Sequence, residues 1–174
     1  MSITVQTERL QLCEATLEDG RFFYELLNTP SWIEFIGDRG IRTLEDAESY
    51  IQQSLISSYL ENGFGLYKMV LREKNQPIGL CGLVKRSDLK KPDIGFAILP
   101  EYEGKGLVFE AAVAVLEYAR QVLGQDEVWA ITTEENLKSR RLIERIGLGY
   151  VKHVQFDADQ QQFLLYSNKV VTQN

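Results

Sequence analysis

Apolar runs divide the chain into strands and helices from one end to the other. Runs rich in β-branched and aromatic residues predict strands at residues 3–13, 64–71, 78–85, 94–99, 127–132, 151–156 and 162–170. Apolar positions at helical spacing predict helices that begin near Thr16, near Thr43, after Gly106 and after Asn136. No repeat or linker interrupts this order, so we expect a single domain over residues 1–174.

Residues at the expected helix ends support these boundaries. Thr16 and Thr43 each precede acidic residues, so the threonine can cap the helix and the acids suit its positive end. Asn136 can cap the last helix in the same way. Gly124 and Gly147 follow apolar helical faces and suit C-terminal stops, where the chain takes a left-handed conformation.

A strand, a glycine turn and a long helix follow one another in residues 94–124. Gly104 and Gly106 flank Lys105, and glycine allows positive φ or a close approach to a ligand. A loop of free N–H groups that leads into a helix N-terminus binds anions, because unpaired amides and the helix dipole both favour phosphate. A plain strand–turn–helix corner explains the same residues, and this alternative stays open.

Composition and charge narrow the classes of function. The chain has 174 residues, of which 44% are hydrophobic and 25% charged, as in ordinary soluble globular domains. A net charge of −6 argues against nonspecific nucleic-acid or anionic-membrane binding and favours a cationic substrate. An acidic surface that serves only solubility is the alternative.

Cysteine and histidine usage favours a reducing compartment and no metal site. Cys13 and Cys81 are expected to be free, buried thiols, and His153, the one histidine, is expected to be structural. No cysteine pair has the spacing of metal ligands. The N-terminus lacks a basic segment and an apolar run, and no apolar stretch approaches the length of a bilayer span. We therefore expect a cytoplasmic protein.

Three stretches carry a family resemblance. Residues 94–111, Ile-Gly-Phe-Ala-Ile-Leu-Pro-Glu-Tyr-Glu-Gly-Lys-Gly-Leu-Val-Phe-Glu-Ala, resemble the acetyl-CoA-binding motif of the GNAT N-acetyltransferases. The likeness is greatest to the branch that acetylates N-terminal amines of ribosomal proteins, whose loop commonly reads Tyr-Trp-Gly-Lys-Gly-Tyr-Ala-Thr-Glu-Ala. Residues 136–148 resemble the second motif of the family, Asn-x-x-Ser-x-x-x-x-Glu-Lys-x-Gly-Phe. Residues 7–12 resemble its opening strand, Thr-Glu-Arg-Leu-x-Leu.

The resemblance implies the GNAT fold and a site for acetyl-CoA. The fold is α/β (α+β), a mixed, mostly antiparallel sheet of six or seven strands with helices on both faces. The backbone of Ile98 and Leu99 would pair with the pantetheine arm. The family prefers Arg or Gln where Glu103 stands and Gly or Ala where Val108 stands. The pyrophosphate would be held by the loop amides of Glu103, Gly104, Lys105, Gly106, Leu107 and Val108.

The resemblance also implies catalytic roles. Ser139 matches a residue near the sulfur and would donate to the leaving thiolate, and Asn136 would contact the pantetheine region. Both residue types are also ordinary at the start of a helix. Asp93 is the candidate for base or amine recognition, and a water-exposed acid at a strand start is the alternative. Many members place a tyrosine acid at the position of Ile143, so that acid is absent here.

The acceptor would lie under the first two helices, which overhang the cleft in the family. Trp32, Glu34, Phe35 and Tyr50 are therefore candidate substrate-binding residues, with Glu34 a second candidate base. Plain packing of the aromatic side chains explains them as well.

Three functions follow from these observations. The first is acetyl transfer from acetyl-CoA to a primary amine, either a protein N-terminus or a small amine, by direct attack in a ternary complex. The second is a non-catalytic module that binds coenzyme A or an acyl-CoA. The third is binding of another phosphate ligand, although the fingerprint Gly-x-Gly-x-x-Gly is absent because Phe109 takes the place of its last glycine. Both a monomer and a homodimer are compatible with the sequence.

Overall fold

Eight strands form one sheet in the order β1-β2-β3-β4-β5-β6-β8-β7, in a computed structural model that describes residues 2–156 and 160–169. Every neighbouring pair is antiparallel except β5 and β6, which are parallel. The prediction of a mixed, mostly antiparallel sheet is therefore confirmed. The strands are β1 Ile3–Gln6, β2 Leu10–Cys13, β3 Leu66–Leu71, β4 Gln76–Val84, β5 Asp93–Ile98, β6 Trp129–Thr132, β7 Gly149–Gln155 and β8 Gln162–Ser167.

The predicted count of six or seven strands is wrong, because residues 3–13 form two strands instead of one. The N–H of Thr7 donates to the carbonyl of Leu10 at 2.9 Å, and its Oγ1 accepts from the N–H of Leu10 at 3.0 Å. The chain reverses here, and Ile3 pairs with Cys13. At the other end of the chain, β7 and β8 pair as the predicted hairpin. The predicted turn at residues 157–159 and the predicted strand end at residue 170 lie outside the described residues.

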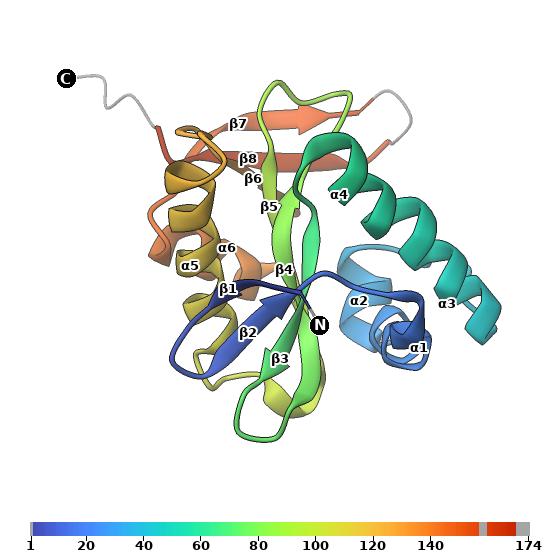
Figure 1. Cartoon of the computed structure of the whole chain (residues 1–174). Helices are drawn as coiled ribbons and strands as arrows, with labels where there is room; N and C mark the ends of the chain where they lie inside the picture. The colour runs from blue at the N-terminus through green and yellow to red at the C-terminus, as the bar shows by residue number, and fades with distance from the viewer. Residues whose placement is uncertain (1, 157–159, 170–174) are drawn as a thin grey trace.

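Helices cover both faces of the sheet, as the resemblance implied (Figure 1). α5 and α6 pack on one face, and α1 to α4 on the other. A π-helical stretch joins α3 to α4, so the helix predicted from Thr43 to about Tyr59 is one continuous segment. The helical segments are α1 Gly20–Leu27, α2 Pro30–Phe35, α3 Leu44–Tyr50, the π-helical Ile51–Ile56, α4 Ser57–Asn62, α5 Leu107–Gln121, α6 Leu137–Arg145 and the 3-10 turns Leu17–Asp19 and Pro100–Tyr102.

The predicted caps at Thr43 and Asn136 are in place. The side chain of Thr43 accepts from the N–H of Asp46 at 3.1 Å, and the Asp46 carboxylate accepts from the N–H of Thr43 at 3.0 Å. This reciprocal pair satisfies two N–H groups that the helix itself leaves free. Asn136 caps α6, and Gly124 and Gly147 have φ of +66° and +100°. Local sequence therefore determines where these helices begin and end.

Two apolar cores lie on the two faces of the sheet. The first packs α5 and Ile143 of α6 against the sheet, and the second packs α1, α2 and α3 against the opposite face. Cys13 and Cys81 are buried and free, as predicted. His153 is exposed on β7, where its Nδ1 lies 2.7 Å from the hydroxyl of Tyr150.

The strand β4 lies unusually close to its neighbours at two glycines. A Cβ atom at Gly79 would lie 2.3 Å from the carbonyl oxygen of Ala97 in β5, and one at Gly82 would lie 2.1 Å from the carbonyl oxygen of Gly65, just before β3. Any side chain would force these strands apart. The two glycines thus fix the spacing of the strands that lead into β5.

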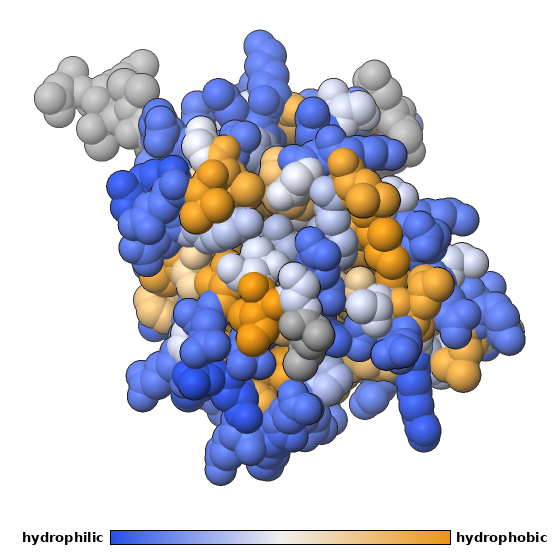
Figure 2. Space-filling view, in the orientation of Figure 1, coloured by the Kyte–Doolittle hydropathy of each residue, from blue (hydrophilic) through white to orange (hydrophobic). Residues whose placement is uncertain are grey.

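Polar residues cover most of the face seen in Figure 2, with apolar patches among them. Leu44 at the start of α3 and Leu60 in α4 are among the exposed apolar side chains. Within residues 2–156 and 160–169, no helix combines the length and apolarity that a membrane span requires.

Candidate functional site

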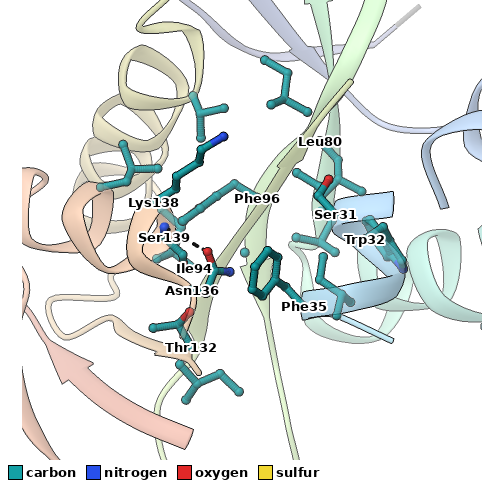
Figure 3. A pocket seen from close by; sticks show the side chains of 18 of the residues that line it. Ser31, Trp32, Phe35, Leu80, Ile94, Phe96, Thr132, Asn136, Lys138 and Ser139 are labelled. Atoms are coloured by element: carbon teal, nitrogen blue, oxygen red, sulfur yellow. Dashed lines mark hydrogen bonds between the residues drawn. The ribbon is translucent and has the colours of Figure 1, made fainter. Parts of the chain in front are cut away.

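A cavity opens where the parallel strands β5 and β6 separate. Among the described residues of these strands, only Asp93 and Trp129 pair, so the rest of β5 has no neighbour on this side. The cavity has a volume of about 870 Å³ and is lined by β5, α2, α6 and the loop before α5. In Figure 3, side chains of α6 and Asn136 face those of α2 across it. The sheet thus leaves a groove with an unpaired strand edge along its floor.

The loop before α5 presents free N–H groups to this cavity. Gly104 and Gly106 have φ of +74° and +75°, conformations that glycine takes readily. Among the described residues, no acceptor in the chain pairs with the N–H groups of Gly104, Lys105 and Gly106. The first N–H groups of α5 add to them, since a helix leaves these unpaired. The loop therefore has the geometry of the anion sites that phosphate groups occupy in proteins.

All but two of the predicted cofactor-binding residues line the cavity. The exceptions are Lys105, whose ammonium lies over the ring of Tyr102 at 5.5 Å, and Leu99. Leu99 is buried, and its N–H donates to the carbonyl of Ile78 at 2.8 Å. Its N–H is therefore not free to pair with a pantetheine arm. The residues that do line it are Ile98, Glu103, Gly104, Gly106, Leu107, Val108, Asn136 and Ser139.

An ion pair braces the loop from outside the cavity. Glu110, in the first turn of α5, accepts from Nε of Arg9 at 2.6 Å and from Oγ1 of Thr7 at 2.6 Å. Arg9 also donates to the carbonyl of Lys105 at 2.9 Å. Partial burial opposes ionisation of Glu110, but the bonds from Thr7 and Arg9 outweigh it and lower the pKa of Glu110. The turn between β1 and β2 thus holds the loop in place, a role that the sequence did not reveal.

Basic side chains of α6 line the opposite wall. Lys138 lies 3.2 Å from the carboxylate of Glu103, so the acid that departs from the family pattern is paired. Arg145 stacks over the ring of Phe109 at 4.6 Å, and Arg141 also lines the cavity. Sequence reasoning missed these residues, although a spacing of three and four is the signal that puts them on one helix face.

Asn136 and Ser139 lie at the start of α6. The Asn136 side chain accepts from the N–H of Ser139 at 3.2 Å, so the expected N-cap is present. Both residues line the cavity, and Asn136 faces it together with Thr132 of β6 (Figure 3). Ile143, at the position of the family's tyrosine acid, is 1% exposed and belongs to the core.

Asp93 lies at the inner end of the groove, where β5 and β6 make their one pair. The residue is 1% exposed, and its carboxylate accepts a hydrogen bond from Nε of Arg86 at 3.0 Å. Burial raises the pKa of Asp93 to about 6, although the Arg86 guanidinium acts in the opposite direction. The alternative of a water-exposed acid is therefore wrong. The strand pairing that buries Asp93 is a long-range feature, which the local pattern does not contain.

The predicted acceptor residues divide into two groups. Trp32, Phe35 and Tyr50 line the cavity, and the ring of Phe35 faces the open space in Figure 3. Burial raises the pKa of Tyr50. Glu34 is exposed and does not line the cavity, because its neighbours on α2 take the inward positions. The structure thus brings the three aromatic residues to the site and leaves the carboxylate outside.

Several lining residues on this side escaped the sequence reasoning. Arg39 follows α2, Arg86 follows β4, and Phe156 and Phe163 come from the ends of β7 and β8. The two phenylalanine rings pack with centroids 5.5 Å apart. Only the fold brings these four distant positions to one cavity. Within the described residues, no group of three or more histidine, cysteine or carboxylate side chains could hold a metal ion.

Comparison with known proteins agrees with this geometry. The family profile described as "Acetyltransferase (GNAT) domain" matches residues 9–149. The uncharacterized N-acetyltransferase YnaD of Bacillus subtilis is 26% identical over 144 residues, which are 83% of this chain and 81% of that protein. Spermidine N(1)-acetyltransferase of Escherichia coli is 24% identical over 131 residues, 75% of this chain and 67% of that protein. The crystal structure of an acetyltransferase from Agrobacterium tumefaciens superposes with a TM-score of 0.79, at 24% identity, over 96% of this chain and 95% of that one.

Proposed function

Because the chain belongs to the GNAT family of acetyltransferases, which take their acetyl group from acetyl-CoA, we propose that it transfers this group to a primary amine by direct attack in a ternary complex. The observation that carries the proposal is the continuity of the site. One cavity joins the free amides of the loop at Gly104 and Gly106 to the aromatic pocket at Phe35 and Tyr50. Both substrates can therefore meet on β5 without a covalent enzyme intermediate.

Coenzyme A would enter from the side of α5 and α6. Its pyrophosphate would accept hydrogen bonds from the N–H groups of Gly104, Lys105 and Gly106, at the positive end of the α5 dipole. Lys138 would offset the charge of Glu103, which lies 3.2 Å away. The pantetheine arm would lie along the unpaired edge of β5, where its amide groups replace the missing strand neighbour.

The chemistry needs a neutral amine and a protonated leaving group. We assign the first task to Asp93, which would take a proton from the incoming ammonium group. The amine nitrogen then attacks the thioester carbon, and the carbon–sulfur bond breaks when the tetrahedral intermediate collapses. The thiolate receives a hydrogen bond from Ser139 and takes up a proton from solvent, while the nitrogen of the amide product gives up its second proton to solvent. Positioning of the two substrates supplies much of the rate.

A non-catalytic module that binds coenzyme A is the second candidate. The observation in its favour is Ile143, which is 1% exposed where many family members have a tyrosine acid. Such a module would bind acetyl-CoA and release no thiol in the presence of any amine.

Two measurements separate these functions. Calorimetry with acetyl-CoA tests the cofactor site, and release of free thiol from acetyl-CoA in the presence of an amine panel tests turnover. We expect binding and amine-dependent thiol release, both with the wild-type chain. Binding without release across the panel would favour the module, and the absence of binding would contradict both candidates.

A further inference from the structure

The net charge of the side chains that line the cavity is opposite in sign to the net charge of the whole chain. Among the described residues, five basic side chains and two acidic ones line it, an excess of three positive charges, whereas the chain carries −6. The overall acidity is therefore no guide to the ligand. The basic residues are Arg39, Arg86, Lys138, Arg141 and Arg145, and the acidic ones are Asp93 and Glu103.

We propose that the acceptor is a primary amine whose own molecule carries a carboxylate, which the guanidinium groups of Arg39 and Arg86 recognise. This proposal rests on the proposed acetyl transfer and names the class of its acceptor. Arginine is suited to such a role because its planar fork matches carboxylate and phosphate oxygens.

Arg39 has its charge available for a ligand. Among the described residues it forms no ion pair and no hydrogen bond. The neighbouring carboxylate of Asp38 is occupied by Arg42, at 2.5 Å and 3.1 Å. Asp46, which lines a smaller hollow of about 270 Å³ together with Arg39, accepts from the N–H groups of Arg42 and Thr43. Both nearby acids thus have other partners.

Arg86 has donors to spare as well. It bonds Asp93 through Nε at 3.0 Å, and within the described residues its two terminal nitrogens have no partner. Its side chain is 39% exposed while that of Asp93 is 2% exposed, so Arg86 remains open to a ligand although its partner is buried. A ligand anion can therefore bind Arg86 without breaking its pair with Asp93.

A polycation would find few partners in the same place. Glu34 does not line the cavity, and Asp93, the carboxylate at the β5–β6 end, is already paired with Arg86. A spermidine molecule would bring two further ammonium groups next to two arginines. Like charges repel, and the cost grows as water is excluded. The aromatic side chains of Phe35, Tyr50 and Phe163 instead favour an acceptor with an apolar or aromatic body.

The test measures thiol release from acetyl-CoA with matched amines. One pair is phenylalanine and phenylalaninamide, and another is the peptides Phe-Asp-Asp and Phe-Asn-Asn with amidated C-termini. Spermidine represents polycations. We expect the anionic member of at least one pair to have a kcat/KM about tenfold higher or more. The pair that shows the preference tells whether the anion comes from a free small molecule or from an acidic peptide.

Variants then connect the preference to Arg39. Arg39→Gln should lower kcat/KM for the anionic amine about tenfold and leave the neutral one within about twofold, and Arg39→Lys should restore part of the loss. Arg21→Gln is the control, because Arg21 is exposed on α1, lies outside the cavity and forms no hydrogen bond or ion pair among the described residues. It should leave both amines unchanged.

The outcomes separate this proposal from the proposed function. Turnover without a preference for the anionic member of either pair, or efficient acetylation of spermidine, would overturn the acceptor class and leave acetyl transfer intact. Equal losses for both members of a pair in Arg39→Gln would also overturn it. Acetyl-CoA binding with no turnover of any amine would overturn the proposed function and this inference together.

Discussion

Replacing Gly104 with alanine tests whether the conformation of the loop creates the anion site. Gly104 has φ of +74°, and a left-handed conformation costs an L-residue about 1–2 kcal/mol. No heavy atom lies within 4 Å of an added Cβ, so the substitution introduces backbone strain without a collision. Gly124 is a matched control, because it has φ of +66°, is equally open and follows the far end of α5.

The strain must appear either in folding or in binding. If the alanine loop relaxes in the free protein, acetyl-CoA has to restore the arrangement of its N–H groups, and about 1–2 kcal/mol is lost from the binding free energy. That loss weakens affinity about 5- to 30-fold. We expect this result for Gly104→Ala, since open space around the loop allows it to relax. We expect Gly124→Ala to lose only unfolding free energy, with unchanged affinity.

Calorimetry with acetyl-CoA and urea unfolding of each variant measure the two terms. For Gly104→Ala the losses in binding and in unfolding free energy should together reach about 1–2 kcal/mol. An affinity within twofold of the wild type and an unchanged unfolding free energy in Gly104→Ala would together refute the reasoning, and so would an equal loss of affinity in Gly124→Ala.

Further predictions concern three charged pairs. If Asp93 is the base, kcat/KM should rise with pH around a midpoint of about 6, and Asp93→Asn should abolish this rise; an unchanged profile would contradict the role. Because the folded pKa of Asp93 is raised, its favourable contribution to unfolding free energy exists at low pH and is lost as pH rises through about 6. Urea titrations should therefore show a smaller pH effect in Asp93→Asn. Arg9→Gln should raise the Kd for acetyl-CoA about three- to tenfold and lower the unfolding free energy by about 1 kcal/mol or less. The effect on unfolding is small because the pair with Glu110 is partly exposed. Unchanged affinity would contradict the role of Arg9 in holding the loop. Lys68→Ala should cost about 3–5 kcal/mol in urea unfolding, since it leaves the largely buried Asp19 carboxylate without its partner at 2.6 Å, and a cost under about 1 kcal/mol would contradict this account.

The parts of the site that depend on neighbours in the chain could be predicted from the sequence. The glycines at 104 and 106 are read locally, because positive φ is a property of the residue itself. The same holds for Asn136, whose amide caps the helix three residues ahead. A motif of this kind needs no knowledge of the sheet, so the loop and both helix starts were found at the right positions.

The parts that depend on strand pairing could not be predicted in this way. Arg9 and Glu110 are 101 positions apart, and nothing near either residue indicates its partner. The sequence around Asp93 fits both a base in the site and a water-exposed acid, because its burial follows from pairing with β4 and β6. The sequence also predicts Glu34 in the cleft, because a short helix of six residues gives too little periodicity to tell its inward face from its outward face.

Among the described residues, a single bridge between Asp93 and Trp129 connects the two parts of the sheet. On one side lie β1 to β5 and on the other β6, β8 and β7, and apart from this bridge the two blocks of strands are joined by the apolar core under α5 and α6. A ligand bound in the groove between β5 and β6 would connect the two blocks of strands. Hydrogen exchange of the amides along β5 should therefore slow when acetyl-CoA is present, and the whole chain should gain about 2.7 kcal/mol in unfolding free energy when free acetyl-CoA is at a hundred times its Kd.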